Sequence, residues 1–101
     1  MVNVKMNDEK FSYEYQQLKN EIKIAFVDTR CKLTNDSFDN GTRFMQLARK
    51  LSNLTSEHKF EKLAHEEKTY MNYLISEYYE DLLNDLKRMV INEIHEKINS
   101  I

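Results

Sequence analysis

A single glycine and no proline are present in the 101-residue chain. Strands must reverse every few residues, and these two residue types supply most of the turns that allow it. The scarcity therefore excludes β-sandwiches, β-barrels and doubly wound α/β folds. A hydrophobic content of 41% is too high for a disordered chain. We expect an all-α protein with one domain over residues 1–101.

Apolar residues alternate at spacings of four and three through the first third of the chain. The stripe comprises Phe11, Tyr15, Leu18, Ile22, Ala25, Phe26 and Leu33. Asn7 or Asp8 can cap the start, where acidic residues suit the positive end of the helix dipole. The pattern predicts a flexible segment 1–7 and a first helix over about 8–33, which packs along a partner helix at a shallow angle.

A cluster of turn-forming residues separates this helix from the next. It lies between residues 34 and 42 and contains Asn40-Gly41, a pair that favours a positive φ. Beyond it, Phe44, Leu47, Ala48 and Leu51 recur at helical spacing. They predict a second helix over about 42–52, with Thr42 as its cap.

From residue 54 to the end, no glycine or proline interrupts the helical spacing of apolar residues. This pattern predicts a third helix over about 55–99, which would be about 65 Å long against about 40 Å for the first. In an antiparallel up-down-up bundle, the third helix then overhangs its neighbours by about 25 Å. The alternative is a break near residues 66–69 that folds the chain back into a four-helix bundle.

The overhang carries apolar side chains that a monomer would leave in water. Each would contribute about 1.5–3 kcal/mol if it were buried. These residues are Leu83, Leu86, Met89, Val90, Ile94 and Ile98. We expect a second copy of the chain to cover them, and the sequence therefore predicts a homodimer with this seam.

Tyrosines and acidic residues gather in the middle of the third helix. Glu77, Asp81 and Asp85 lie one turn apart on one ridge, where like charges disfavour the helix by a few tenths of a kcal/mol per pair. Tyrosine is enriched in interface hot spots. We therefore predict that a protein partner with a basic surface binds Tyr70, Tyr73, Glu77, Glu80, Asp81 and Asp85. A solubilising acidic face and core tyrosines are the alternatives.

His58, Glu61 and His65 share one helical face, and this residue set suits zinc. The trio lies beside the apolar positions Phe60 and Leu63, so we interpret it as a solvated polar stripe and predict no metal site. No cofactor is predicted, because the sequence lacks a glycine-rich phosphate loop, a paired-cysteine motif and a nucleophile with a base.

Arg88 and His95 are separated by six residues, a spacing that resembles the Arg-x(4–6)-His signature of HEPN ribonucleases. HEPN proteins are small helical bundles that dimerise. The resemblance implies His95 as the acid/base and Arg88 as the phosphate ligand. It covers these two residues only, and Met89 stands where the family has a polar residue. A HEPN-like ribonuclease is the first alternative function.

Residues 45–59 resemble a helix-turn-helix with Ala48 in the small-residue position, but Asn53 and His58 occupy normally apolar positions. A modest basic spot accompanies it, formed by Arg43, Arg49 and Lys50. The formal charge of -2 excludes a generally basic nucleic-acid binder. A DNA-binding regulator is therefore only the second alternative function.

The longest uninterrupted apolar run is Ile24–Val27, far too short for a signal peptide or a membrane span. The lone Cys31 cannot form an internal disulfide, which fits a reducing compartment. We therefore expect a cytoplasmic protein without a membrane anchor. Because Cys31 follows Val27 by one turn, we interpret it as a small core or seam residue rather than a reactive thiol.

These patterns together predict a small non-enzymatic regulator, inhibitor or adaptor that acts by protein–protein contact as a homodimer. The abundance of Asn, Lys, Ile and Glu is typical of an AT-rich genome, such as that of a phage, another mobile element or a low-GC bacterium.

Overall fold

A computed structural model describes residues 8–56 and 58–99 of the protein. The described residues form α1 (Tyr13–Lys32), α2 (Ser37–Ser56), α3 (His58–Glu61) and α4 (His65–Asn99), and a short 3-10 helix, Asp8–Lys10, precedes α1. The predicted all-α bundle with a long C-terminal helix is confirmed. The predicted flexible segment 1–7 lies outside the described residues.

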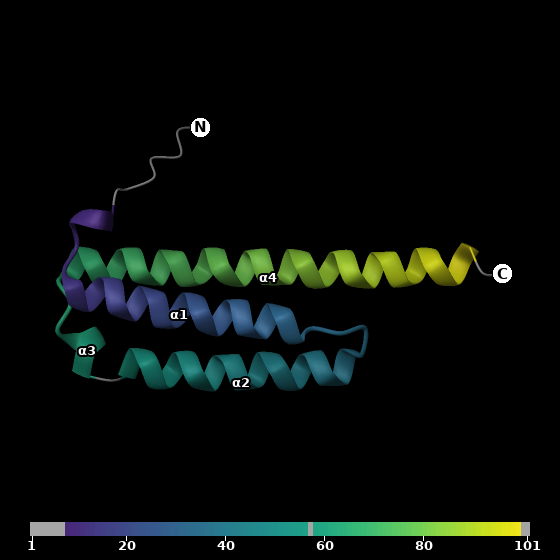
Figure 1. The fold of residues 1–101 in the computed structure, drawn as a ribbon, viewed down its shortest axis with the longest axis horizontal. Helices are drawn as coiled ribbons and strands as arrows, with labels where there is room; N and C mark the ends of the chain where they lie inside the picture. The colour runs from purple at the N-terminus through teal and green to yellow at the C-terminus, as the bar shows by residue number, and fades with distance from the viewer. Residues whose placement is uncertain (1–7, 57, 100–101) are drawn as a thin grey trace.

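The three long helices run up, down and up, with α1 between α2 and α4 (Figure 1). Two contacts fix the direction of α4 relative to α1. At one end the backbone N–H of Ser12 donates to the Glu67 carboxylate at 2.7 Å. At the other end Arg30 Nε lies 2.7 Å from Asp85 Oδ2. The residue near the start of α1 thus contacts the start of α4, and the residue near the end of α1 contacts a later position of α4. The two helices are therefore parallel.

The first helix begins later than predicted. The chain leaves the 3-10 helix at Phe11, and Ser12 caps α1, since its hydroxyl accepts a hydrogen bond from the N–H of Tyr15 at 3.2 Å. A serine at this position satisfies one of the free N–H groups at the helix start. The predicted continuous helix over 8–33 is therefore wrong at its N-terminal end.

The second helix is almost twice as long as predicted. Asp36, rather than Thr42, caps it, because one carboxylate oxygen accepts from the N–H groups of Phe38 and Asp39 at 2.8 and 3.1 Å. The buried side chain of Asn40 closes the preceding turn by bonding Thr34 twice. Gly41 lies inside α2 and has no positive φ, so the expected Asn-Gly turn does not form.

The predicted third helix is interrupted, but not near residues 66–69. The interruption lies at 62–64, between α3 and α4, where Leu63 turns into the core. One carboxylate oxygen of Glu67, the third residue of α4, accepts a hydrogen bond from the N–H of Ala64 at 2.8 Å. This bond caps the start of α4. From His65 to Asn99 the helix continues without a break.

The hydrophobic core is confined to one part of the molecule. Its buried side chains are Tyr15, Leu18, Ile22, Ala25, Phe26, Leu47, Leu51, Leu63, Met71, Leu74 and Leu82. The predicted apolar face of α1 is thus confirmed, whereas Ala48 on α2 is exposed. Beyond Leu82, no described residue of α4 belongs to the core.

Helix α4 extends well past its neighbours, as the mismatch in helix length predicts (Figure 1). It has 35 residues and α1 has 20. At 1.5 Å per residue the difference is about 22 Å. The radius of gyration is 16.7 Å, against about 13 Å for a compact domain of this length. We call the part of α4 beyond the core, residues 83–99, the α4 arm.

Candidate functional site

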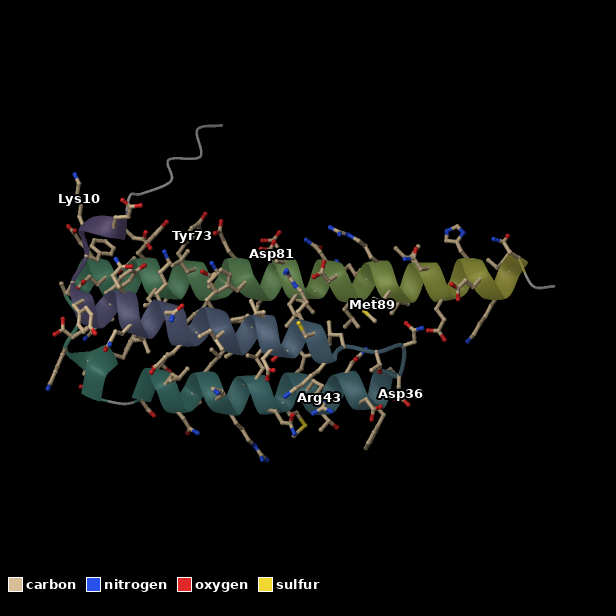
Figure 2. All side chains as sticks on the ribbon, viewed as in Figure 1. Lys10, Asp36, Arg43, Tyr73, Asp81 and Met89 are labelled. Atoms are coloured by element: carbon tan, nitrogen blue, oxygen red, sulfur yellow. The ribbon has the colours of Figure 1, made fainter. Side chains whose placement is uncertain are left out.

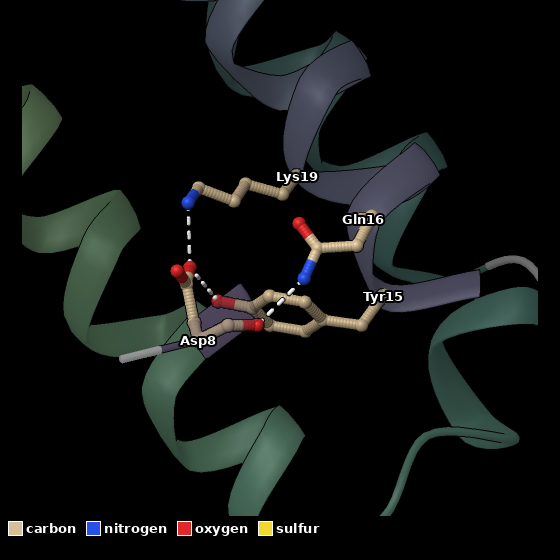
Figure 3. Close-up of polar contacts among 4 residues, drawn as sticks. All are labelled: Asp8, Tyr15, Gln16 and Lys19. Carbon is tan, nitrogen blue, oxygen red and sulfur yellow. Dashed lines mark hydrogen bonds and ion pairs between the residues drawn. The ribbon is translucent and has the colours of Figure 1, made fainter. Parts of the chain in front are cut away.

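A buried polar cluster joins the 3-10 helix to α1 (Figure 3). The Asp8 carboxylate accepts from the Tyr15 hydroxyl at 3.0 Å and from Lys19 Nζ at 2.5 Å, while Gln16 Nε2 donates to the Asp8 carbonyl at 2.6 Å. Burial alone would raise the pKa of Asp8, but the hydrogen bonds from Lys19 and Tyr15 to its carboxylate and the charge of Lys19 outweigh burial and lower the pKa. Burial and the neighbouring Asp8 carboxylate raise the pKa of Tyr15 far above its ordinary value. Both groups hold the fold together.

Glu67 joins the starts of α1 and α4. Besides the N–H of Ala64, its carboxylate accepts from the N–H and the hydroxyl of Ser12, each at 2.7 Å. Burial would raise the pKa of Glu67, yet these hydrogen bonds stabilise the charged form and lower the pKa. The sequence assigns no role to Glu67, and it predicts Asp8 only as a cap of the first helix.

Of the predicted tyrosine cluster on α4, Tyr73 is exposed, whereas Tyr70, Tyr78 and Tyr79 are half-buried and pack against the core. Tyr78 and Tyr79 contact the ring of Phe26 at centroid distances of 5.4 and 5.0 Å. Tyr70 and Tyr73 stack on each other at 5.8 Å, and Tyr73 is 54% exposed. The Tyr73 hydroxyl donates to Glu77 at 2.5 Å, and this bond to a carboxylate raises the pKa of Tyr73.

The predicted acidic ridge continues from this tyrosine pair along the outer side of α4. Tyr73 and Asp81 both point away from α1 and α2 (Figure 2). Glu77, Glu80 and Asp81 are exposed, and none of them forms an ion pair with a described lysine or arginine. We call the residues Tyr70, Tyr73, Glu77, Glu80 and Asp81 the contact patch.

Asp85 does not share the environment of the other acidic residues. It is half-buried and bonds Arg30 of α1 at 2.7 Å, with Arg88 of its own helix at 3.7 Å. Its charge is therefore largely engaged within the chain. Asp85 fastens the end of α1 to α4, a role that the sequence analysis did not assign to it.

The residues of the predicted dimer seam lie on two sides of the α4 arm. Leu86 and Met89 are half-buried, and Met89 lies beside the end of α1 (Figure 2). The other four are 47–62% exposed, and we call them the apolar row: Leu83, Val90, Ile94 and Ile98. Ile91, which the sequence analysis omitted, is also 52% exposed.

The residues of the two alternative functions, ribonuclease and DNA-binding regulator, lie on the surface or beside a hollow. Arg88 and His95 are both exposed on the α4 arm. Arg43 and Lys50 line a shallow hollow between α1 and α2, and Arg49, next in sequence to Lys50, points about 100° away from it around the helix. The three basic residues therefore do not form one face.

The expectation that His58, Glu61 and His65 share one helical face is wrong, because His65 belongs to a different helix. No group of three His, Cys, Asp or Glu side chains that could hold a metal ion occurs among the described residues. The side chain of His58 lies outside that description. Glu61 and His65 belong to different helices, α3 and α4, because the chain turns between them.

Cys31 is exposed on α1, so it is not a core residue, and its alternative interpretation as a seam residue stays a prediction. The buried face of α1 carries its own heptad stripe, and Cys31 belongs to the opposite side of the helix.

No known protein family, curated protein or solved structure matches this chain. None of the described helices combines the length and the apolar character that a bilayer crossing requires.

Proposed function

We propose that this protein is a small non-enzymatic regulator, inhibitor or adaptor that binds another protein through the outer side of α4. The observation that carries this proposal is the exposed apolar row on an uninterrupted helix. Exposed apolar surface of this kind is typical of sites that another molecule covers. A break in α4 would have offered another way to bury it, but none occurs between His65 and Asn99.

The contact patch adds a charge requirement to this surface. Its carboxylates belong to the same helix as the apolar row and precede it along the chain. Desolvating three acidic side chains is costly unless cations meet them. The partner that fits is therefore a protein that offers an apolar groove for the row and basic side chains for the patch.

Tyr73 gives the contact patch an aromatic anchor. Its ring is already ordered by stacking on Tyr70 and by the hydrogen bond to Glu77. An ordered aromatic side chain loses little entropy on binding, and its face can receive an arginine of the partner. Tyr73 and the row would thus form the two ends of one binding surface.

Affinity capture from the native host, followed by binding measurements with the purified captured protein, tests the proposal. Ile94→Glu should weaken binding at least tenfold, since it places a charge in the apolar contact. The double variant Glu80→Lys, Asp81→Lys should weaken binding by lowering the association rate constant, with a strong dependence on salt. Met45→Glu on α2 replaces a residue that is 61% exposed and lies outside this surface; it is the matched control and should leave partner binding unchanged.

Two results would contradict the proposal. One is a captured protein whose binding ignores all of these α4 substitutions. The other is a wild-type dimer that Ile94→Glu dissociates, which would show that a second copy covers the row, as the sequence predicts.

A further inference from the structure

The outward side of α1 carries a second set of regularly spaced residues. They lie opposite the buried stripe, at alternating spacings of four and three: Tyr13, Gln17, Asn20, Ile24, Val27 and Cys31. All six are exposed, including Tyr13 at 71%, Ile24 at 56% and Val27 at 49%. We call this set the outer seam. A single helix therefore has two heptad faces, and the fold buries only one of them.

The outer seam has the register of a coiled coil. Counting from the spacing, Gln17, Ile24 and Cys31 occupy a positions, and Tyr13, Asn20 and Val27 occupy d positions. Branched apolar residues sit at the centre of the seam. The amide of Asn20, at a d position, lowers the stability of the seam.

The charges beside the seam are segregated by sign. The e positions on one flank are all acidic: Glu14, Glu21 and Asp28. The g positions on the other flank are neutral or basic: Gln16, Lys23 and Arg30. In a parallel pair each g residue meets an e residue of the other helix, five positions later. In an antiparallel pair the acidic e positions of the two helices would face each other and repel.

We propose that the outer seam binds a second copy of the same chain, so that two α1 helices form a short parallel coiled coil. Lys23 would pair with the second copy's Asp28, and the two-fold symmetry repeats this pair. The apolar contacts Ile24 and Val27 would lie at its centre. This inference is independent of the partner proposed for α4.

The fold leaves room for such a pairing. Both α2 and α4 pack against α1, and the side chains of α1 that contact them belong to its buried stripe and its edges. Arg30 bonds Asp85 towards α4, and Asp28 lines the hollow towards α2. The neighbouring helices therefore lie behind α1 and beside its flanks, and the outer seam is the side turned away from them.

The expected association is weak but specific. The seam spans fewer than three heptads, and two of its six side chains are amides. However, α1 is already folded by the core, so pairing does not have to pay for helix formation. We expect a dissociation constant on the order of micromolar, which corresponds to about 8 kcal/mol of binding free energy.

Cys31 provides a built-in reporter, because it is the single cysteine of the chain. In a parallel pair the two Cys31 residues occupy the same a position and face each other, as a disulfide requires. The oxidant diamide would take up the two protons and two electrons that the thiols lose. In an antiparallel pair Cys31 would instead face the second copy's Tyr13, about 27 Å along the helix from the other cysteine.

The test is disulfide trapping of the full-length protein at several micromolar, read on a non-reducing gel, with sedimentation equilibrium of the reduced protein beside it. Most of the wild-type chain should become a covalent dimer within minutes. Ile24→Lys should reduce the rate at least tenfold and abolish the reversible dimer. Ile91→Lys, an equally exposed isoleucine on α4, is the matched control and should trap like the wild type.

Charge variants test the orientation separately. Lys23→Glu and Asp28→Lys should each trap several-fold more slowly than the wild type, because each places like charges across both symmetric contacts. An equimolar mixture of the two should recover the wild-type rate through mixed dimers. Circular dichroism of each variant verifies that α1 remains folded.

Three outcomes would overturn the inference. The first is a trapping rate that is equal for the wild type and Ile24→Lys, which indicates random collision of exposed thiols. The second is a mixture of charge variants that traps no faster than its components. The third is a reduced wild-type protein that remains monomeric at hundreds of micromolar.

Discussion

The two halves of α4 differ in what surrounds them, although they belong to one uninterrupted helix. The half from His65 to Leu82 buries Met71, Leu74 and Leu82, and Glu67 fastens its start to α1. The α4 arm, from 83 to 99, contains no core residue and touches α1 only near its beginning. A single helix thus divides its residues between stabilising the fold and presenting a surface.

The largest expected difference between the halves concerns apolar truncation. Leu82→Ala removes a side chain that is 1% exposed and should lower the free energy of unfolding by about 3 kcal/mol. Ile94→Ala removes one that is 51% exposed and should change it by less than about 0.5 kcal/mol. Urea unfolding followed by circular dichroism measures both. Equal losses would mean that the arm is buried in the protein as it exists in solution.

The second expected effect concerns the start of α4. Glu67→Gln removes the charge that receives hydrogen bonds from Ser12 and Ala64, and it should lower the free energy of unfolding by about 2 kcal/mol. Glu66→Gln changes the neighbouring exposed carboxylate and should have almost no effect. If both substitutions cost the same, the capping role of Glu67 is wrong.

Acid should lower the free energy of unfolding through the carboxylates of Glu67 and Asp8. Folding lowers the pKa of Glu67 and Asp8 from their ordinary values of 4.5 and 3.8. Their stabilisation is therefore complete above those values and is lost as the pH falls below them towards the folded pKa. Chemical unfolding between pH 6 and 3 should show this loss, and Glu67→Gln should reduce its steepness. An unchanged pH profile in that variant would contradict the assignment.

The smallest expected effect lies where the two halves meet. Arg30→Gln breaks the ion pair with half-buried Asp85 and should cost about 0.5–1 kcal/mol. Lys32→Gln breaks a pair with Asp28 in which both side chains are largely exposed, and it should cost less. Thermal melts of the two variants, recorded in low and high salt, compare them. A larger loss for Lys32→Gln would reverse the roles given to the two pairs.

Much of the fold could be predicted because its signals are local. The stripe from Phe11 to Leu33 and the apolar spacing of α4 repeat within a few residues, so each identifies a helix without any knowledge of its neighbours. The overhang followed from lengths alone. The interruption at 62–64 does not follow from the sequence, which predicts a continuous helix or, as the alternative, a break near 66–69, because no glycine or proline marks the turn and a buried leucine makes it.

The polar contacts could not be predicted, because they join residues that are distant in sequence. Ser12 and Glu67 are 55 positions apart, and nothing near either residue indicates the other. The start of α2 illustrates a different difficulty. Asp36 and Thr42 are both good capping residues, and the choice depends on the turn that Asn40 closes with Thr34.

Cys31 shows why spacing alone does not identify the buried face of a helix. Both faces of α1 have the same alternating spacing, offset by two residues, so Val27 and Cys31 match a core pattern as well as the buried residues do. Only the positions of α2 and α4 decide which face is covered. A helix with two such faces is a sequence signal in its own right.

Because α1 and α4 are parallel, the proposed α1 dimer would present both α4 arms to a target together. Two chains joined side by side along α1 would project both α4 arms in the same direction from the same end of the dimer. A target with two matching grooves, or a symmetric target, would then be held at two points, and the second attachment would occur at a high effective concentration. Modest individual contacts would in this way add up to a long residence time.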